Sequence, residues 1–231
     1  GTDTIHVIDD SGHTDDTGDI TVNAGAVASI KITDAANGNE IDTHTMTTDD
    51  TYTLYASGYD SEGNYTGLVS VAWSFSNGVF DSGDLSSSSG TSTTFDPNNT
   101  GVDIIQASDG THSDSTGNIT VNAGAVASIK ITDSPGGSEI STHTMTTDDT
   151  YTLYASGYDA EGNYAGLVNT ADWSFNDAYG AVFDEGTDFS GGYTDVSSVT
   201  FSPTVTGTDT IHVIDDSGHT DDTGDITVNA G

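Results

Sequence analysis

Internal repetition limits the fold of this 231-residue chain more than any other feature, because repeated segments build repeated structural units. The segment NAGAVASIKITD stands at residues 23–34 and again at 122–133. The segment THTMTTDDTYTLYASGYD stands at 43–60 and again at 142–159, with the same offset of 99 residues. The sequence therefore predicts two homologous units, one at 23–122 and one at 123–231. The second is longer, and its extra residues form an insertion near 176–198.

A third repetition joins the two ends of the chain, since residues 1–25 match residues 207–231 at every position. Residues 1–22 are therefore predicted to be the terminal hairpin of a preceding domain, or of one completed by a neighbouring chain. Two accounts follow. The chain is a segment of a long tandem array with a period of 206 residues, or its first strands complete a neighbour's domain by strand addition. The second account must explain how a donated hairpin displaces residues 207–228, which already supply one.

Short runs with alternating apolar residues predict that each unit is all-β. In the first unit the predicted strands are 27–33, 51–60, 68–76, 91–97, 102–109 and 117–123. Gly, Asn, Asp and Ser separate these runs, as they do at turns. Strands of this length, spread over about 100 residues, are typical of a two-layer β-sandwich. In the run 68–76, Trp73 shares one face with Val71 and Phe75, so we expect Trp73, and Trp173 in the second unit, to lie in the cores.

Charge and composition exclude several function classes. The net charge is −35, with two Lys, no Arg and no Cys. A nucleic-acid partner or an anionic membrane surface would need cationic groups, so neither is expected, and nor is direct membrane insertion. Without Cys there is no disulfide, thiolate metal site or thiol nucleophile. No nucleophile turn and no cleft with paired carboxylates is indicated either, so we expect the chain not to be an enzyme.

The order of motifs in both units resembles a known family. AVASIKIT, MTTDDTYTLYASGYDSEGNYTGLVSVAWSFS, GTSTTFDPNNTGVDIIQAS and GNITVNAG follow one another as in the bacterial immunoglobulin-like (Big, invasin/intimin-type) domains. The resemblance implies tandem immunoglobulin-like β-sandwiches of an extracellular surface protein. It implies a stalk, spacer or filament, with other copies or further repeats of the same protein as head-to-tail partners. The extreme acidity and the insertion depart from the family pattern.

The acidic residues raise the question of a bound cation, and Ca²⁺ is the candidate cofactor. Asp-rich turns supply the oxygen ligands that Ca²⁺ prefers, but Asp also suits turns without a metal. The loop DSEGN and its copy DAEGN lack the closing Glu of a helix–loop–helix calcium loop. The candidate calcium ligands are Asp49, Asp50, Asp60, Glu62, Asp148, Asp149, Asp159, Glu161, Asp215, Asp216, Asp221 and Asp222.

The insertion of the second unit carries the alternative function, because a binding module concentrates its differences in one patch. Its aromatic residues are Tyr179, Phe183, Phe189 and Tyr193. They are predicted either to bind carbohydrate or a receptor, as in an adhesin, or to pack against a neighbouring domain or chain. The sequence leaves both interpretations open.

Overall fold

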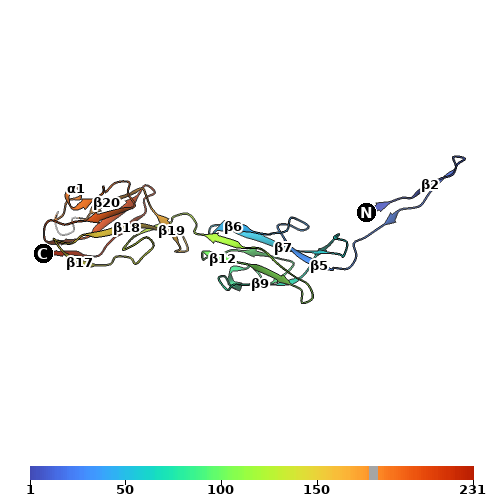
Figure 1. The fold of residues 1–231 in the computed structure, drawn as a ribbon, viewed down its shortest axis with the longest axis horizontal. Coiled ribbons are helices and arrows are strands. Elements are labelled where there is room, and N and C mark those ends of the chain that lie inside the picture. The colour runs from blue at the N-terminus through green and yellow to red at the C-terminus, as the bar shows by residue number, and fades with distance from the viewer. Residues whose placement is uncertain (177–181) are drawn as a thin grey trace. The chain divides into compact units, whose positions relative to one another are not determined.

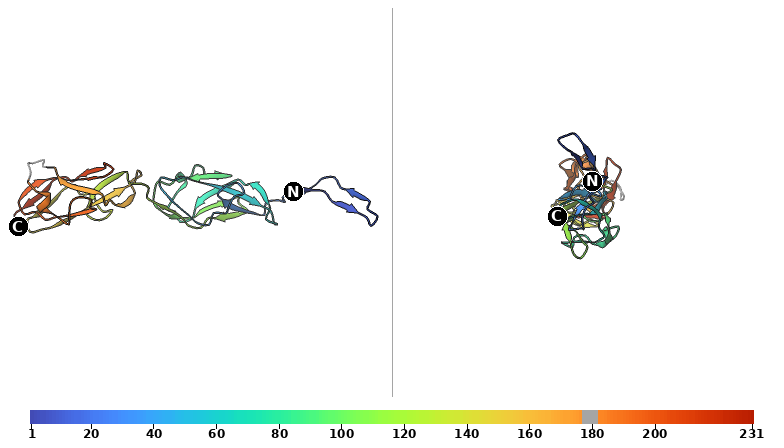
Figure 2. Two further views of the ribbon diagram at one scale, coloured as in Figure 1. Left: turned by 90° about the horizontal axis from the view of Figure 1, so that it is seen from above. Right: turned by 90° about the vertical axis from the view of Figure 1, so that its right-hand side faces the viewer.

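The computed structural model describes residues 1–176 and 182–231, and its elements are almost all β-strands. The chain divides into two compact units (Figures 1 and 2). Unit 1 comprises residues 1–45, 51–97 and 102–120. Unit 2 comprises residues 46–50, 98–101 and 121–231, so it includes two short segments from the first repeat.

The first layer of unit 1 is built around its longest strand, β7 (Tyr52–Tyr59). One edge of β7 pairs with β5 (Ser29–Thr33), and the other pairs with β11 (Ser92–Phe95) and β8 (Tyr65–Leu68). β7 is long because TYTLYASGYD alternates without interruption and places Leu54 and Ala56 on the inner face, both fully buried.

The second layer of the first repeat continues the order of predicted strands. The hairpin of β13 (Ile105–Ser108) and β14 (Ser113–Ser115) lies beside β9 (Val71–Phe75), with β10 (Ser89–Gly90) at its edge. Further along the same hairpin, β12 (Gly101–Asp103) pairs with β15 (Ile119–Asn122). β15 also pairs with β6 (His44–Thr47). One 3₁₀ turn, η1 (Ser82–Asp84), begins after Asp81, whose side chain accepts a hydrogen bond from the Gly83 N–H.

Unit 2 repeats most of this plan and differs in one short strand, which joins the first layer instead of the second. Its first layer contains β18 (Tyr151–Tyr158), flanked by β16 (Ser128–Thr132) and by β22 (Ser198–Phe201) with β19 (Tyr164–Leu167), and β21 (Phe189–Ser190) pairs with β22. The second layer contains β20 (Ala171–Phe175), β24 (Ile211–Asp215) and β25 (Thr220–Asp222). It continues through β17 (His143–Thr146), β26 (Ile226–Asn229) and β23 (Gly207–Asp209). The short helix α1 (Glu185–Asp188) lies in the insertion.

The N-terminal residues form a hairpin of two paired ribbons. β1 (Thr2–Asp3) pairs with β4 (Ile20–Thr21), and β2 (His6–Ile8) pairs with β3 (Thr14–Asp16). These strands are the counterparts of β23, β26, β24 and β25, as the identical sequences require. Every residue of the four strands is exposed.

Apolar side chains from the two layers meet in the core of each repeat. Trp73 and Trp173 are 3% and 2% exposed, so the prediction that both lie in the cores is confirmed. Each indole N–H donates to a backbone carbonyl, Gly90 for Trp73 and Val196 for Trp173, at 3.2 and 3.1 Å. A buried indole needs such a partner. The predicted fold class is confirmed as well, because both repeats are immunoglobulin-like β-sandwiches.

Candidate functional site

The turn between β7 and β8 is organised by a buried carboxylate. Asp60 is 5% exposed and accepts hydrogen bonds from the backbone N–H groups of Gly25 (2.8 Å) and Asn64 (2.8 Å). The Asn64 side-chain amide donates to both of its oxygens, at 3.1 and 3.0 Å. The bond from Gly25 and those from Asn64 lower the pKa of Asp60 to about 2. This carboxylate is therefore an ionised acceptor for its own turn.

The equivalent turn of unit 2 gains one more donor. Asp159 is 2% exposed and accepts from the Thr48 hydroxyl at 2.7 Å and from the Gly124 N–H at 3.1 Å. The Gly124 N–H also donates to the Thr48 hydroxyl oxygen at 2.9 Å. Although burial raises the pKa of Asp159, bonds from Thr48, Asn163 and Gly124 bring it down to about 2. We call Thr48, Gly124 and Asp159 the Thr–Gly–Asp cluster.

The Asp pairs that follow β6 and β17 also bind backbone groups. Asp50 accepts from the Thr47 N–H and hydroxyl, both at 2.8 Å, and Asp149 accepts from Thr146 in the same way. The bonds from Thr146 lower the pKa of Asp149. Asp49 accepts from the Ala125 N–H at 2.7 Å. Three of these four carboxylates thus close the turns on which they stand or fix the start of the next strand, and the fourth, Asp148, is exposed.

The acidic residues of the C-terminal hairpin point in different directions. Asp215 is 8% exposed and accepts from His219 Nδ1 at 2.8 Å, and Asp222 accepts from His212 Nδ1 at 2.8 Å. Asp221 accepts from the Ile131 N–H at 2.7 Å, and burial raises the pKa of its carboxyl. Asp216 is exposed.

The predicted calcium ligands are therefore spread over separate turns. Glu62 and Glu161 are exposed, while the nearby carboxylates of Asp60 and Asp159 are buried and accept hydrogen bonds from protein groups. Among residues 1–176 and 182–231, no group of three or more Asp, Glu, His or Cys side chains could hold a metal ion. A calcium site therefore stays a prediction, and the geometry supplies a different explanation for most of the Asp residues, which accept hydrogen bonds from protein donors.

The insertion of unit 2 contributes to the core of its own sandwich. Phe183 and Phe189 are 5% and 6% exposed, and Phe189 stacks on Phe175 with ring centroids 4.5 Å apart. This corrects the expectation of a surface patch for these two residues, because buried rings cannot contact a ligand or partner. Tyr193 is 38% exposed, and its carbonyl accepts from the Trp173 N–H at 2.8 Å. Tyr179 lies outside the described residues.

Sequence reasoning missed the Thr–Gly–Asp cluster. A Thr inside a Thr-rich stretch carries no distinctive pattern, so the sequence does not predict Thr48 as a site residue. One feature of the sequence could have indicated the cluster. Each of its three residues, Thr48, Gly124 and Asp159, lies in a segment that the chain contains more than once.

No protein-family model and no curated protein matches the chain. Among solved structures, it is similar to domains 1–6 of the surface layer protein SbsC, with 16% identity, a TM-score of 0.37, and coverage of 100% of this chain and 35% of that one. It is also similar to a C-terminal fragment of intimin, solved in complex with the intimin-binding domain of the translocated intimin receptor. There the identity is 16% and the TM-score 0.32, over 89% of this chain and 65% of that one.

A third similar structure is that of extracellular domains 3–5 of Drosophila OTK, at 11% identity and a TM-score of 0.36, over 100% of this chain and 71% of that one. The chain thus spans about a third of the first of these structures and just under two thirds of the second. Among the described residues, no helix is long and apolar enough to cross a membrane.

Proposed function

We propose that this chain is an extracellular structural segment, a spacer or stalk of repeated immunoglobulin-like domains in a cell-surface protein. It performs no catalysis in this role. The resemblance to bacterial immunoglobulin-like domains of the invasin/intimin type supports this assignment. The proposal rests chiefly on one observation: the two sandwiches repeat not only their cores but also the contacts on their outer faces.

Paired side chains at the outer faces recur at equivalent positions with nearly the same geometry. His44 stacks on Tyr52 with centroids 3.9 Å apart, and His143 stacks on Tyr151 at 3.8 Å. Lys31 pairs with Glu40, and Lys130 pairs with Glu139. A domain that must recognise a ligand needs one distinctive patch, whereas a spacer needs only copies of a stable unit. Repetition of exposed contacts therefore favours the spacer.

The competing function is an adhesin module that binds carbohydrate or a receptor through the insertion. Two of the four aromatic residues proposed for that role lie in the core, where they are not accessible to a ligand. Phe183 and Phe189 fill unit 2 instead of lining a surface. Of the described insertion aromatics only Tyr193 is exposed, and its backbone is committed to Trp173. We therefore retain one function.

The spacer role predicts how single chains respond to force and to potential ligands. Pulling on one chain should give two unfolding steps of similar length, roughly 30 nm each for about 100 residues at ~3.6 Å per residue. The same protein on glycan arrays and cultured cells should show no saturable binding. Saturable binding that Tyr193→Ala abolishes, and that the equally exposed Tyr164→Ala preserves, would instead establish an adhesin.

We also propose that cations stabilise the folded chain, because a net charge of −35 makes the compact state repel itself. Since most of the described Asp carboxylates discussed above bind protein donors, we expect screening to dominate over site binding. The melting midpoint should rise equally in CaCl₂ and NaCl at matched ionic strength, each compared with a low-salt sample containing EDTA. A midpoint that is clearly higher in CaCl₂ would show specific calcium binding.

A further inference from the structure

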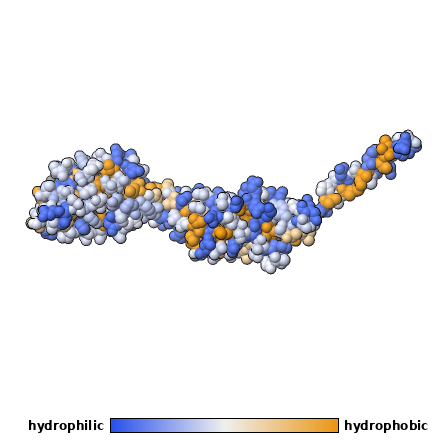
Figure 3. Space-filling model, viewed as in Figure 1, coloured by the Kyte–Doolittle hydropathy of each residue, from blue (hydrophilic) through white to orange (hydrophobic). Residues whose placement is uncertain are grey.

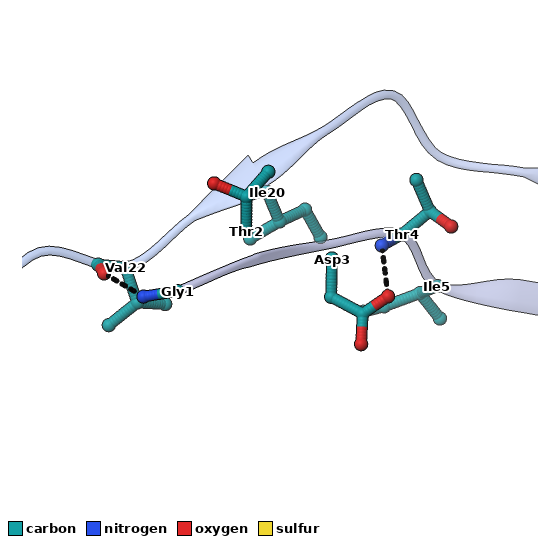
Figure 4. Close-up of a pocket in the computed structure, with 7 residues that line it drawn as sticks. All are labelled: Gly1, Thr2, Asp3, Thr4, Ile5, Ile20 and Val22. Carbon is teal, nitrogen blue, oxygen red and sulfur yellow. Dashed lines mark hydrogen bonds between the residues drawn. The ribbon is translucent and has the colours of Figure 1, made fainter.

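The N-terminal hairpin exposes a row of apolar side chains that a folded sandwich normally buries. Ile5, Val7, Ile20 and Val22 are 63%, 60%, 42% and 69% exposed. Figure 3 shows hydrophobic surface along the hairpin. An open hollow of about 440 Å³ lies at its base, lined by Gly1, Thr2, Asp3, Thr4, Ile5, Ile20 and Val22. Figure 4 shows these residues as sticks. A two-stranded hairpin of this kind is marginally stable in water, and its free edges favour further pairing.

The same apolar side chains are covered where the sequence recurs at residues 207–231. Ile211, Val213, Ile226 and Val228 are the identical counterparts, and they are 1%, 0%, 1% and 2% exposed. β24 pairs antiparallel with β20, and β26 pairs parallel with β17. We call the surface of residues 123–206 that residues 207–231 cover the hairpin site. The structure therefore contains both a filled hairpin site and a second, uncovered segment whose sequence fits it at every position.

We propose that residues 1–25 occupy the hairpin site of a second copy of this chain, in place of that copy's residues 207–231. The inference rests on the proposed structural role and deepens it by naming the coupling between copies. By the register of unit 2, β2 and its flanking residues pair with β20, so that Val7 lies opposite Trp173. β4 and its flanking residues pair with β17, so that Ile20 lies opposite His143.

The Thr–Gly–Asp cluster has an incomplete counterpart that a second copy would complete. The Gly25 N–H already donates to Asp60 at 2.8 Å, and the Gly231 N–H donates to the Thr147 hydroxyl at 3.2 Å. When Gly25 takes the position of Gly231, the parts combine. Asp60 of one copy then accepts from Thr147 of the other, as Asp159 accepts from Thr48.

The hairpin site can hold residues 1–25 of a second copy or residues 207–231 of its own chain, and only the first arrangement adds the Asp60–Thr147 hydrogen bond. All other contacts of the two identical hairpins are the same. The equilibrium between the two arrangements therefore depends on the protein concentration and on the Asp60–Thr147 bond. A tethered hairpin competes at an effective concentration of about millimolar. Exchange is therefore expected where copies are crowded, and the isolated chain in dilute solution should be monomeric. Exchange repeated from copy to copy gives a head-to-tail assembly.

Two glycines provide a matched pair of variants of the full chain. A Cβ at Gly224 would lie 1.6 Å from the carbonyl oxygen of Ser141, so Gly224→Ala forces residues 207–231 out of place. Its counterpart Gly18 has nothing within 4 Å of such a Cβ. Gly18→Ala leaves the free hairpin unchanged but gives it the same clash in the hairpin site. Each variant thus disables one of the two competing hairpins.

The test is the mass of each variant by analytical ultracentrifugation over a concentration series. We expect the Gly224→Ala chain to form head-to-tail oligomers, because the Gly18 hairpin of another copy fits the vacated site. The Gly18→Ala chain and the double variant should stay monomeric. Adding Thr147→Val to Gly224→Ala should weaken association by about tenfold or more, as expected for loss of a hydrogen bond to a carboxylate.

Two results would overturn the proposal. If Gly224→Ala stays monomeric at every concentration, the N-terminal hairpin does not fill the site. If Gly224→Ala and the double variant associate equally, the association is nonspecific. Neither result touches the spacer role, which is measured on single chains.

A second measurement keeps the proposal testable if the Gly224→Ala chain aggregates. A fluorescent peptide of residues 1–25 should bind that chain under conditions where it is soluble, and the Gly18→Ala peptide should bind at least about tenfold more weakly. Equal affinity of the two peptides would overturn the proposal.

Discussion

Replacing Trp173 by alanine is expected to lower the free energy of unfolding of unit 2 by about 3–5 kcal/mol. The indole is 2% exposed and stands at the centre of β20, where Trp173 lies opposite Val213. Its removal leaves a cavity between the two layers, and the Val196 carbonyl loses its bond from Nε1. Because the two layers are held apart by their paired strands, the sandwich cannot collapse to fill that space.

The effect should be confined to one unit. Urea unfolding followed by hydrogen exchange of peptides from each unit separates the two, and the fluorescence of Trp73 reports unit 1 in the same sample. As a control, Tyr164→Ala removes a ring that is 39% exposed and should cost less than about 1 kcal/mol. A loss below about 1 kcal/mol for Trp173→Ala would mean that the core does not depend on this ring.

Local alternation was sufficient to predict the central strands, because their inner and outer faces differ sharply in polarity. The predicted strands 51–60 and 68–76 contain β7 and β9, and Trp73 faces inward as expected. The strand β6 was not predicted, since Met46 is its only apolar residue. Its position depends on pairing with β15, a partner more than 70 residues away that local pattern does not reveal.

The candidate sites were harder to predict, because the type of a residue does not specify which group binds it. The carboxylate of an Asp in a turn can bind either a calcium ion or a backbone N–H group. Only the fold shows that Asp60 accepts hydrogen bonds from the N–H groups of Gly25 and Asn64. Likewise, Phe183 and Phe189 read as a surface patch because they stand among Gly and Asp. Their burial depends on Phe175 and Phe201, which the fold brings beside them.

One buried carboxylate that the sequence did not single out leads to the second large effect. Asp103 is 0% exposed, and one of its oxygens accepts from the N–H groups of Asn77 and Ile104, both at 2.7 Å. Its other oxygen accepts from the Val79 N–H at 2.9 Å. It therefore holds the loop after β9 against β12. Although burial raises the pKa of Asp103, these backbone bonds lower it further, so that its net shift is downward.

Asp103→Ala should destabilise unit 1 by about 3 kcal/mol, because each buried N–H left without an acceptor costs about 1–3 kcal/mol. Asp103→Asn keeps one acceptor oxygen and should cost less. A carboxyl with a lowered pKa stabilises the fold above its unfolded pKa and loses that contribution as the pH falls through the folded value. Urea midpoints measured from pH 5 to pH 2 should therefore fall more steeply for the wild-type chain than for Asp103→Asn. Parallel curves for the two proteins would show that folding does not lower the pKa of Asp103.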